Sequence, residues 1–377
     1  MMTIDTTEPV SVQMTLSSMN RYKNEQFLWN YEHGLLLQSI FILGERTGND
    51  DFCRWVKTMY DTKVTDDGAI ATYNEEEYNL DRINPGKTLF LLYEKYGDEK
   101  YRKAIERLMV QLRRQPRTKA LGFWHKQMYP WQMWLDGLYM AGPFHARYGV
   151  EFGNDEDLDD VVHQFVLMES RARDAETGLL YHAWDESREQ RWANPVTGCS
   201  PLFWGRALGW FCMALVDTLD FIPFDLKHKK QKESLEAIAG RLVTPLLKYQ
   251  DKKSGLWYQV LDQPSSQGNY TESSASAMFT YFLLKSIRLG IVSKIDAPPV
   301  GEAALAAYEG LLNEKIRKDD DGELHLIDIC KVAGLGGDPY RDGSYEYYVN
   351  EPKGEDDFKG VGPFILASME ADSRVKH

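Results

Sequence analysis

The chain has 377 residues, which is long for one ordinary domain and short for three. Hydrophobic residues make up 43% and charged residues 27%, a globular mixture, and the net charge of −13 argues against nucleic acid or an anionic membrane as a partner. Local cationic groups must therefore capture any acidic substrate, because the overall field of the protein repels it.

The N-terminal segment MMTIDTTEPVSVQMTL lacks the basic start and the apolar stretch of an export signal. Residues 1–20 are polar and aperiodic, so we expect a flexible tail followed by a single domain over 21–377. No apolar run approaches about 18 residues, which predicts no membrane span and a cytoplasmic location. The cysteines form no CxxC pair and are expected to be buried free thiols. They are Cys53, Cys199, Cys212 and Cys330.

Long helical patterns dominate the rest of the chain. Apolar residues recur at i, i+3, i+4 and i+7, and runs of about ten to twenty residues favour helix over strand. No regular alternation of strands with these helices suggests a parallel sheet. We therefore predict an all-α protein, with helices over 26–47, 51–62, 86–96, 98–114, 130–148, 156–172, 201–220, 232–250, 272–289, 301–316 and 363–371.

A weak internal repeat accompanies the first of these helices. GERTGNDDF at 44–52 resembles YEKYGDEKY at 93–101, and a degenerate third copy follows ARYG at 146–149. Both clear copies have the form of a helix end, a glycine C-cap and an acidic start to the next helix. Tandem helical hairpins with a period of about fifty residues indicate a repeat architecture.

A second repeat consists of short segments in which a glycine precedes apolar residues. Each segment lies before a strong helix start, where proline or a capping residue favours an N-terminus. Hairpins closed in a ring would bring these N-termini to one face, so we predict an α/α toroid of about six hairpins; a linear helical solenoid is the alternative. The segments are 66–73, 121–126, 177–185, 254–262 and 321–328, and the helix starts are Asn84-Pro85, Tyr129-Pro130, Ser200-Pro201, Thr271-Glu272 and Gly362-Pro363.

One acid lies inside the densest aromatic stretch of the chain, FWHKQMYPWQMWLDGLYMAGPF at 123–144. If Pro130 opens the helix, Asp136 falls in its second turn among apolar and aromatic neighbours. Such surroundings raise the pKa of a carboxyl, which suits a general acid near neutral pH. Asp136-Gly137 is alternatively a simple turn dipeptide, but the unbroken helical pattern on both sides favours a catalytic role.

Asp81, in YNLDRINPGKTLF, lies just before the helix predicted to start at Pro85. Considered alone, it is an acid that the helix dipole favours at an N-terminus. On the same face as Asp136 it becomes a candidate second carboxyl, since glycosidic chemistry commonly needs two.

The segment SPLFWGRALGW at 200–210 places Ser200 as an N-cap and Pro201 as the first helical residue. Arg206 and Trp210 are then i, i+4 neighbours on one face of the helix. An arginine near a helix N-terminus is electrostatically unfavourable unless an anion fills the space between them, which predicts a carboxylate site. The alternative is an Arg206 that stacks on Trp210 or pairs with a nearby acid.

Polar and aromatic residues on two equivalent loops indicate the rim of a pocket. His125 and Lys126 follow a tryptophan, and His182 lies in LLYHAWDES. Indole faces such as that of Trp134 suit stacking on a sugar ring. A lone histidine or a single aromatic residue is, however, more often part of a core. No P-loop, GxGxxG, HExxH or GxSxG is present, and no metal-ligand spacing stands out, so we expect chemistry without a metal or cofactor.

Together these motifs resemble glycoside hydrolase family 105, the unsaturated rhamnogalacturonyl hydrolases. The resemblance rests on FWHKQMYPWQMWLDGLYMAGPF, LDRINPGKTLFLLYE, LLYHAWDES, WANPVTGCSPLFWGRALGW, LWYQVLDQ and CKVAGLGGDPYRDGSYEYYV, and it covers roughly residues 25–372 in the same order. It implies an (α/α)6 barrel. It also implies removal of a terminal 4,5-unsaturated uronic acid from pectin fragments left by lyases, through hydration of the C4=C5 bond.

The resemblance also assigns roles to individual residues. Asp136 matches the general acid/base of the family and Asp81 the second carboxylate. The positions that match substrate contacts are Tyr31, His125, Lys126, His182, Trp204, Arg206 and Trp210, with Tyr31 in the segment that departs most from the family pattern.

Three other functions stay open at this point. The first is an unsaturated glucuronyl hydrolase with the same chemistry and a different leaving sugar, as in glycosaminoglycan fragments. The second is an α/α-barrel sugar epimerase, which needs a pair of histidines as acid and base. The third is a toroid that binds sugar without catalysis.

Overall fold

The computed structural model of the protein describes residues 7–23, 26–294 and 296–375. Helices dominate these ranges, and none of the helices described there is long and apolar enough to cross a bilayer. The helices are α1 (Val10–Arg21), α2 (Tyr31–Thr47), α3 (Asp50–Asp61), α4 (Gly86–Tyr96), α5 (Glu99–Arg114), α6 (Leu135–Glu151), α7 (Asp155–Ala172), α8 (Gly205–Leu219), α9 (Lys229–Tyr249), α10 (Ser273–Arg288), α11 (Ala297–Glu314), α12 (Tyr345–Asn350) and α13 (Phe358–Val375).

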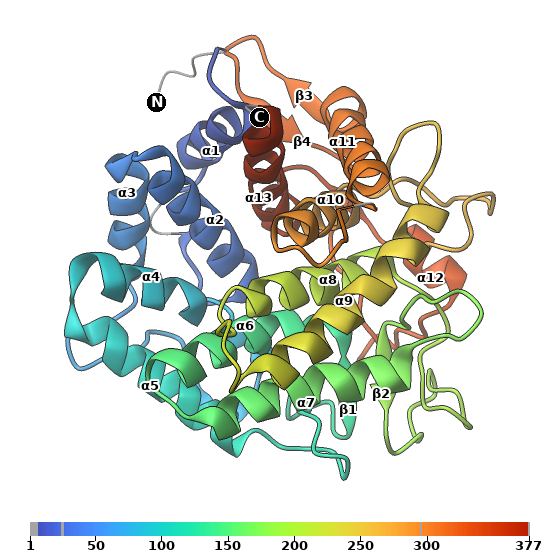
Figure 1. The fold of residues 1–377 in the computed structure, drawn as a ribbon, viewed down its shortest axis with the longest axis horizontal. Coiled ribbons are helices and arrows are strands. Elements are labelled where there is room, and N and C mark those ends of the chain that lie inside the picture. The colour runs from blue at the N-terminus through green and yellow to red at the C-terminus, as the bar shows by residue number, and fades with distance from the viewer. Residues whose placement is uncertain (1–6, 24–25, 295, 376–377) are drawn as a thin grey trace.

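The helices form two concentric rings (Figure 1). In the inner ring, α2, α4, α6, α8, α10 and α13 each pack against the next, and α13 closes the ring against α2. In the outer ring, α3, α5, α7, α9, α11 and α1 each pack against one inner helix. The predicted (α/α)6 barrel is therefore confirmed, and the linear solenoid is wrong because the first and last inner helices are in contact.

Sequence pattern explains which helices lie inside. Every residue of α8 is buried, and most of its side chains are apolar, as expected for a helix surrounded on all sides. The outer helix α5 instead buries one stripe, from Tyr101 through Ile105 and Leu108 to Leu112, at the i, i+3, i+4 and i+7 spacing. The remaining face of α5 is charged and meets solvent. The four cysteines are buried and unpaired, as predicted.

The N-terminal segment forms the outer helix that closes the barrel, so the predicted flexible tail over residues 1–20 is wrong from residue 10 onward. Helix α1 packs on α13, and Met14 is completely buried. Its polar residues misled the sequence prediction, because Ser17 and Ser18 are buried with their hydroxyls donating to carbonyls one turn earlier in the same helix. Residues 1–6 of the predicted tail lie outside the described residues.

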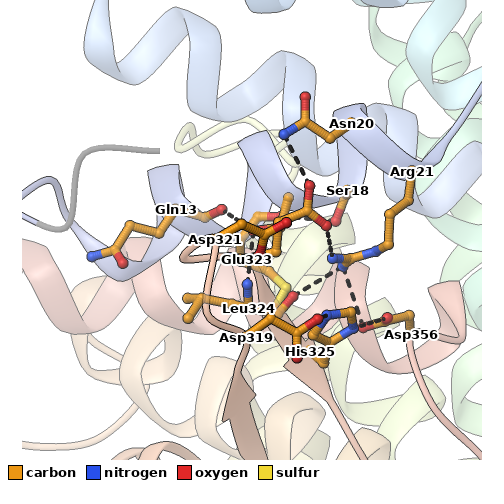
Figure 2. Close-up of polar contacts among 12 residues, drawn as sticks. Gln13, Ser18, Asn20, Arg21, Asp319, Asp321, Glu323, Leu324, His325 and Asp356 are labelled. Atoms are coloured by element: carbon orange, nitrogen blue, oxygen red, sulfur yellow. Dashed lines mark hydrogen bonds and ion pairs between the residues drawn. The ribbon is translucent and has the colours of Figure 1, made fainter. Parts of the chain in front are cut away.

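Polar contacts fasten α1 to the segment after α11 (Figure 2). The Arg21 guanidinium lies 2.9 Å from the Glu323 carboxylate and 3.3 Å from that of Asp356. Asn20 donates to Glu323, and the backbone N–H of Leu324 donates to Ser17. The partners are about 300 residues apart in the chain, so these contacts join its two ends.

Several helices start later than predicted because short strands precede them. The strand β1 (Gln132–Trp134) pairs antiparallel with β2 (Ala183–Asp185), so α6 begins at Leu135 and not at Pro130. Likewise, α8 begins at Gly205, because Trp204 is bridged to Val260. The remaining strands are β3 (Ile316–Lys318) paired with β4 (Leu324–Leu326), and β5 (Ile329–Cys330) paired with β6 (Lys353–Gly354).

Candidate active site

The predicted site residues gather at the N-terminal ends of the inner helices. Tyr31 is the first residue of α2, and Asp81 lies in the short 3₁₀ helix η3 (Leu80–Arg82) that leads to α4. Asp136 is the second residue of α6, and Arg206 is the second residue of α8. The barrel therefore brings together side chains that lie far apart in the sequence, as the ring of helix starts predicted.

Asp136 is held by a histidine that is in turn held by a tyrosine. Nε2 of His182 lies 3.3 Å from Oδ2 of Asp136, and Nδ1 of His182 lies 2.7 Å from the hydroxyl of Tyr348. His182 and Tyr348 are fully buried, whereas 14% of the Asp136 side chain is exposed. When the tyrosine donates to Nδ1, the proton of the ring is on Nε2, facing the carboxylate. The carboxylate is thus the most exposed member of this triad.

These surroundings lower the pKa of Asp136, where the sequence predicted a rise. Burial raises the pKa of the carboxyl, but the neighbouring His182, followed by His125, outweighs burial and holds the pKa below its usual range. The position of Asp136 in the first turn of α6, not the second, also favours the charged form through the helix dipole. Asp136 is therefore ionised in the unliganded protein near neutral pH.

Asp81 belongs to an adjacent charged group. Its Oδ2 lies 2.5 Å from Nζ of Lys126, and its Oδ1 lies 3.4 Å from Nε2 of His125. Burial lowers the pKa of Lys126, but the charge of Asp81 outweighs burial, so the net pKa is raised and the ammonium stays protonated. Burial lowers the pKa of His125 to about 4, so this ring is neutral. His125 interacts electrostatically with both Asp81 and Asp136 and so lies between the two acids.

Aromatic rings form the wall beside the acids. The Trp134 indole is stacked between His125 and Tyr129, with ring centroids 5.0 Å away on either side. Its edge meets His182, at 5.3 Å. Tyr129 and Lys126 are half-buried, so they are the members of this wall that face solvent. Both faces of the Trp134 indole are therefore covered, and the half-buried ring of Tyr129 is the part of the stack that can meet a sugar.

Arg206 holds backbone carbonyls where the sequence predicted a bound anion. Its terminal nitrogens donate to the carbonyl oxygens of Cys330 and Lys331, and its guanidinium lies 4.8 Å from the ring of Trp204. The side chain is 1% exposed. Of the three guanidinium nitrogens of Arg206, Nε is the one that is buried without a hydrogen-bond partner among the described residues. The sequence offered stacking of Arg206 on Trp210 as the alternative, but the guanidinium lies against Trp204, and Trp210 stacks on Tyr139 at 4.9 Å and meets Tyr31 edge-on at 6.1 Å.

Two residues of this site were not singled out from sequence. Tyr348 positions His182, and Gln259 accepts from the Trp204 indole at 3.0 Å and donates to the carbonyl of Tyr348 at 3.0 Å. Both lie inside motifs that carry the family resemblance, LWYQVLDQ and SYEYYV. The second motif contains three tyrosines, and the sequence alone does not indicate which of them faces the site.

Replacing Tyr348 with phenylalanine tests the triad. The change leaves Nδ1 of His182 without its partner, a loss that costs about 1–3 kcal/mol, so kcat should fall about 5- to 100-fold with little change in KM. The acidic side of the pH profile should also move, because His182 controls the charge of Asp136. Tyr347→Phe is the matched control, since that hydroxyl accepts from Gly334 and not from His182. Equal losses in both variants would show that the loss does not depend on the contact of Tyr348 with His182.

Three residues whose side chains could bind a metal ion lie away from the candidate active site, beside α1. They are His325, Glu355 and Asp356. The ring nitrogens of His325 already contact Asp356 at 2.6 Å and Asp319 at 2.8 Å. Arg317 pairs with Glu355 and Asp319. The group therefore fits an ion-pair network that fastens α1 better than a metal site.

Comparisons with known proteins show the family to which this fold belongs. The sequence profile of Glycosyl Hydrolase Family 88 matches residues 10–375. A family 105 glycoside hydrolase structure from C. acetobutylicum ATCC 824 is 45% identical, with a TM-score of 0.92, covering 97% of this chain and 100% of that one. Protein Atu3128 of Agrobacterium fabrum is 42% identical over 234 residues, 62% of this chain and 98% of that protein. Unsaturated rhamnogalacturonyl hydrolase YesR of Bacillus subtilis is 30% identical over 272 residues, 70% of this chain and 72% of YesR. The chain therefore belongs to the glycoside hydrolases of families 88 and 105.

Proposed function

We propose that the protein removes the terminal 4,5-unsaturated uronic acid, of the galacturonyl-rhamnose type, from pectin and rhamnogalacturonan oligosaccharides produced by lyases. The observation that carries the proposal is the partly exposed Asp136 carboxyl, held by His182 beside a second acid, Asp81. The similarity to YesR, which is named an unsaturated rhamnogalacturonyl hydrolase, supports the choice of sugar.

The reaction begins with proton transfer from Asp136 to C4 of the double bond. Water then adds at C5 and gives up a proton to the Asp136 carboxylate, which restores the acid. The hemiketal formed at C5 opens, the ring C–O bond breaks, and the remaining sugar leaves from C1 as an alcohol. Asp81 positions the water, and the half-buried Lys126 orients the uronate carboxylate.

A saturated analogue decides whether the double bond is required. We expect an unsaturated galacturonyl-rhamnose disaccharide to react and its saturated counterpart to be inert, because hydration has no C4=C5 bond to protonate. Absorbance of the enol ether follows the first reaction, and chromatography of released rhamnose follows both. Comparable release from the two disaccharides would assign ordinary displacement at the anomeric carbon.

A panel of lyase products separates the proposed sugar from its alternative. Rhamnogalacturonan fragments should be turned over with a higher kcat/KM than unsaturated glycosaminoglycan disaccharides. The reverse order would make the protein an unsaturated glucuronyl hydrolase. The epimerase alternative needs two histidines that reach the substrate, and it fits poorly because His182 is fully buried and His125 is 3% exposed.

A further inference from the structure

The end of the barrel opposite the active site contains a cavity of about 130 Å³, here called the rear cavity. Each inner helix contributes to its wall, so it lies on the barrel axis. Half-buried or exposed residues at its rim, among them Ile42, Leu91 and Asp220, connect it with solvent. The wall includes residues from all six inner helices; one from each, in chain order, are Gln38, Lys87, Arg147, Asp217, Lys285 and Leu366.

Most charges around the rear cavity are already paired. Nζ of Lys285 lies 2.7 Å from Asp217, 2.6 Å from Asp220 and 2.8 Å from the hydroxyl of Tyr281. Arg147 pairs with Glu94 and Glu151. The two aspartates share the Lys285 ammonium.

Lys87 is different, because its ammonium has no hydrogen-bond partner within the described chain. The residue is 4% exposed, and Nζ lies 3.4 Å from the centroid of the Tyr139 ring. Contact with an aromatic face compensates only part of the cost of burying a charge. Burial accordingly lowers the pKa of Lys87 to about 7.

We propose that the rear cavity is a binding site for one small monovalent anion, of the size of chloride or formate, held by Nζ of Lys87. The volume admits such an ion with one or two waters. Among the described residues, two other polar atoms close to Lys87 or in the wall also lack partners: the hydroxyl of Tyr139, and the amide oxygen of Gln38, whose amide group can turn to donate.

The site communicates with the active site through stacked rings. Lys87 lies under Tyr139, Tyr139 stacks on Trp210, and Trp210 meets Tyr31 at the start of α2. Tyr139 is also three residues after Asp136 on α6.

Proton linkage gives the site a recognisable pH dependence. An anion binds the protonated lysine, so with a pKa of about 7 its apparent affinity should fall about tenfold between pH 6 and pH 8. The charged groups that face Lys87 are Asp217 and Asp220 on α8, Lys285 and Tyr281 on α10, and Tyr139 and Arg147 on α6. Burial raises the pKa values of Tyr139 and Tyr281, and the aspartates raise that of Lys285 against burial, so these three groups keep their protons over this range.

The test uses the full chain with bromide, chloride and gluconate. Crystals soaked in bromide should show anomalous density within about 4 Å of Lys87 Nζ, a charge-assisted contact distance. Chloride should raise the unfolding temperature above that in gluconate at equal ionic strength, more at pH 6 than at pH 8. Density elsewhere only, or equal stabilisation by the two salts, would overturn the proposal.

Two variants make the test specific. Lys87→Met should remove the difference between chloride and gluconate, whereas Lys119→Met, at an exposed lysine far from the cavity wall, should keep it. A chloride effect that persists in Lys87→Met would assign the ion to another place. If Lys87→Met does not fold, the bromide position and the pH dependence of the wild-type protein decide the question. None of these readouts depends on the proposed sugar hydrolysis.

Discussion

Asp136→Asn should lower kcat by about 10²- to 10⁴-fold, the range that general acid catalysis contributes. The amide keeps the volume of the carboxyl, and the backbone of α6 is unchanged, so circular dichroism should match the wild type. The amide of the variant, however, carries no proton that it can give to C4. Binding of substrate should persist, which also separates a hydrolase from a toroid that only binds sugar.

Asp81→Asn is the comparison that assigns the two carboxyls. It should be harmful but less so, because Asp81 positions Lys126 and His125 and does not deliver the proton to C4. If Asp136→Asn stays within about tenfold of wild type while Asp81→Asn is inactive, the roles are reversed. If both variants stay active, the chemistry occurs elsewhere.

The lowered pKa of Asp136 predicts a pH dependence with a definite sign. The free enzyme holds the carboxylate in its ionised form near neutral pH, whereas proton transfer to C4 needs the acid. Since kcat/KM reports the free enzyme, it should rise as pH falls from 8 to 5. Initial rates at low substrate concentration measure it. A kcat/KM that is flat over this range would make Asp136 a base toward water and assign proton donation to another group.

Arg206→Met should both destabilise the protein and impair catalysis. Each hydrogen bond from a charged donor contributes about 1.5–3 kcal/mol to stability. The variant loses the two hydrogen bonds to the carbonyls of Cys330 and Lys331, so the free energy of unfolding should fall by about 3–6 kcal/mol. These carbonyls lie in the segment that leads to Tyr348. Thermal unfolding and steady-state kinetics should therefore change together.

Arg206→Lys separates the structural role from substrate binding. Lysine keeps the positive charge but lacks the planar fork that reaches two carbonyls, so it should recover little of the lost stability. A variant with normal unfolding temperature and a raised KM alone would mark Arg206 as a ligand of the substrate carboxylate, as the sequence predicted, with no structural function.

The barrel was predictable because its signals are local. Gly48 and Gly97 end α2 and α4 in the left-handed conformation, as the repeat of helix end and glycine indicated. The third copy departs from the pattern, since α6 continues through Gly149 to Glu151. Helix starts at Gly86 and Ser273 also fall within a residue or two of prediction.

The chemistry of the site was less predictable because it depends on distant residues. The neighbours of Asp136 one helical turn away in the sequence predicted a raised pKa, but His182 on another loop reverses the direction. The partners of Arg206 are carbonyls 124 and 125 residues later, and carbonyls leave no signature in a side-chain pattern. The closing helix α1 was missed for a similar reason, because serine hydroxyls satisfied within the helix allow a polar sequence to be buried.

The contact of α2 with α13 governs when the barrel can close during synthesis. A ribosome synthesises α2 well before α13, so the inner ring stays open until α13 has emerged. Pairs such as Arg46 with Glu370, 324 residues apart, cannot form earlier, and such long separations slow folding. The nascent chain meanwhile exposes the apolar face of α2 that α13 will cover, the kind of surface that chaperones bind. The contact of His182 with Tyr348 likewise cannot form until Tyr348 has been synthesised.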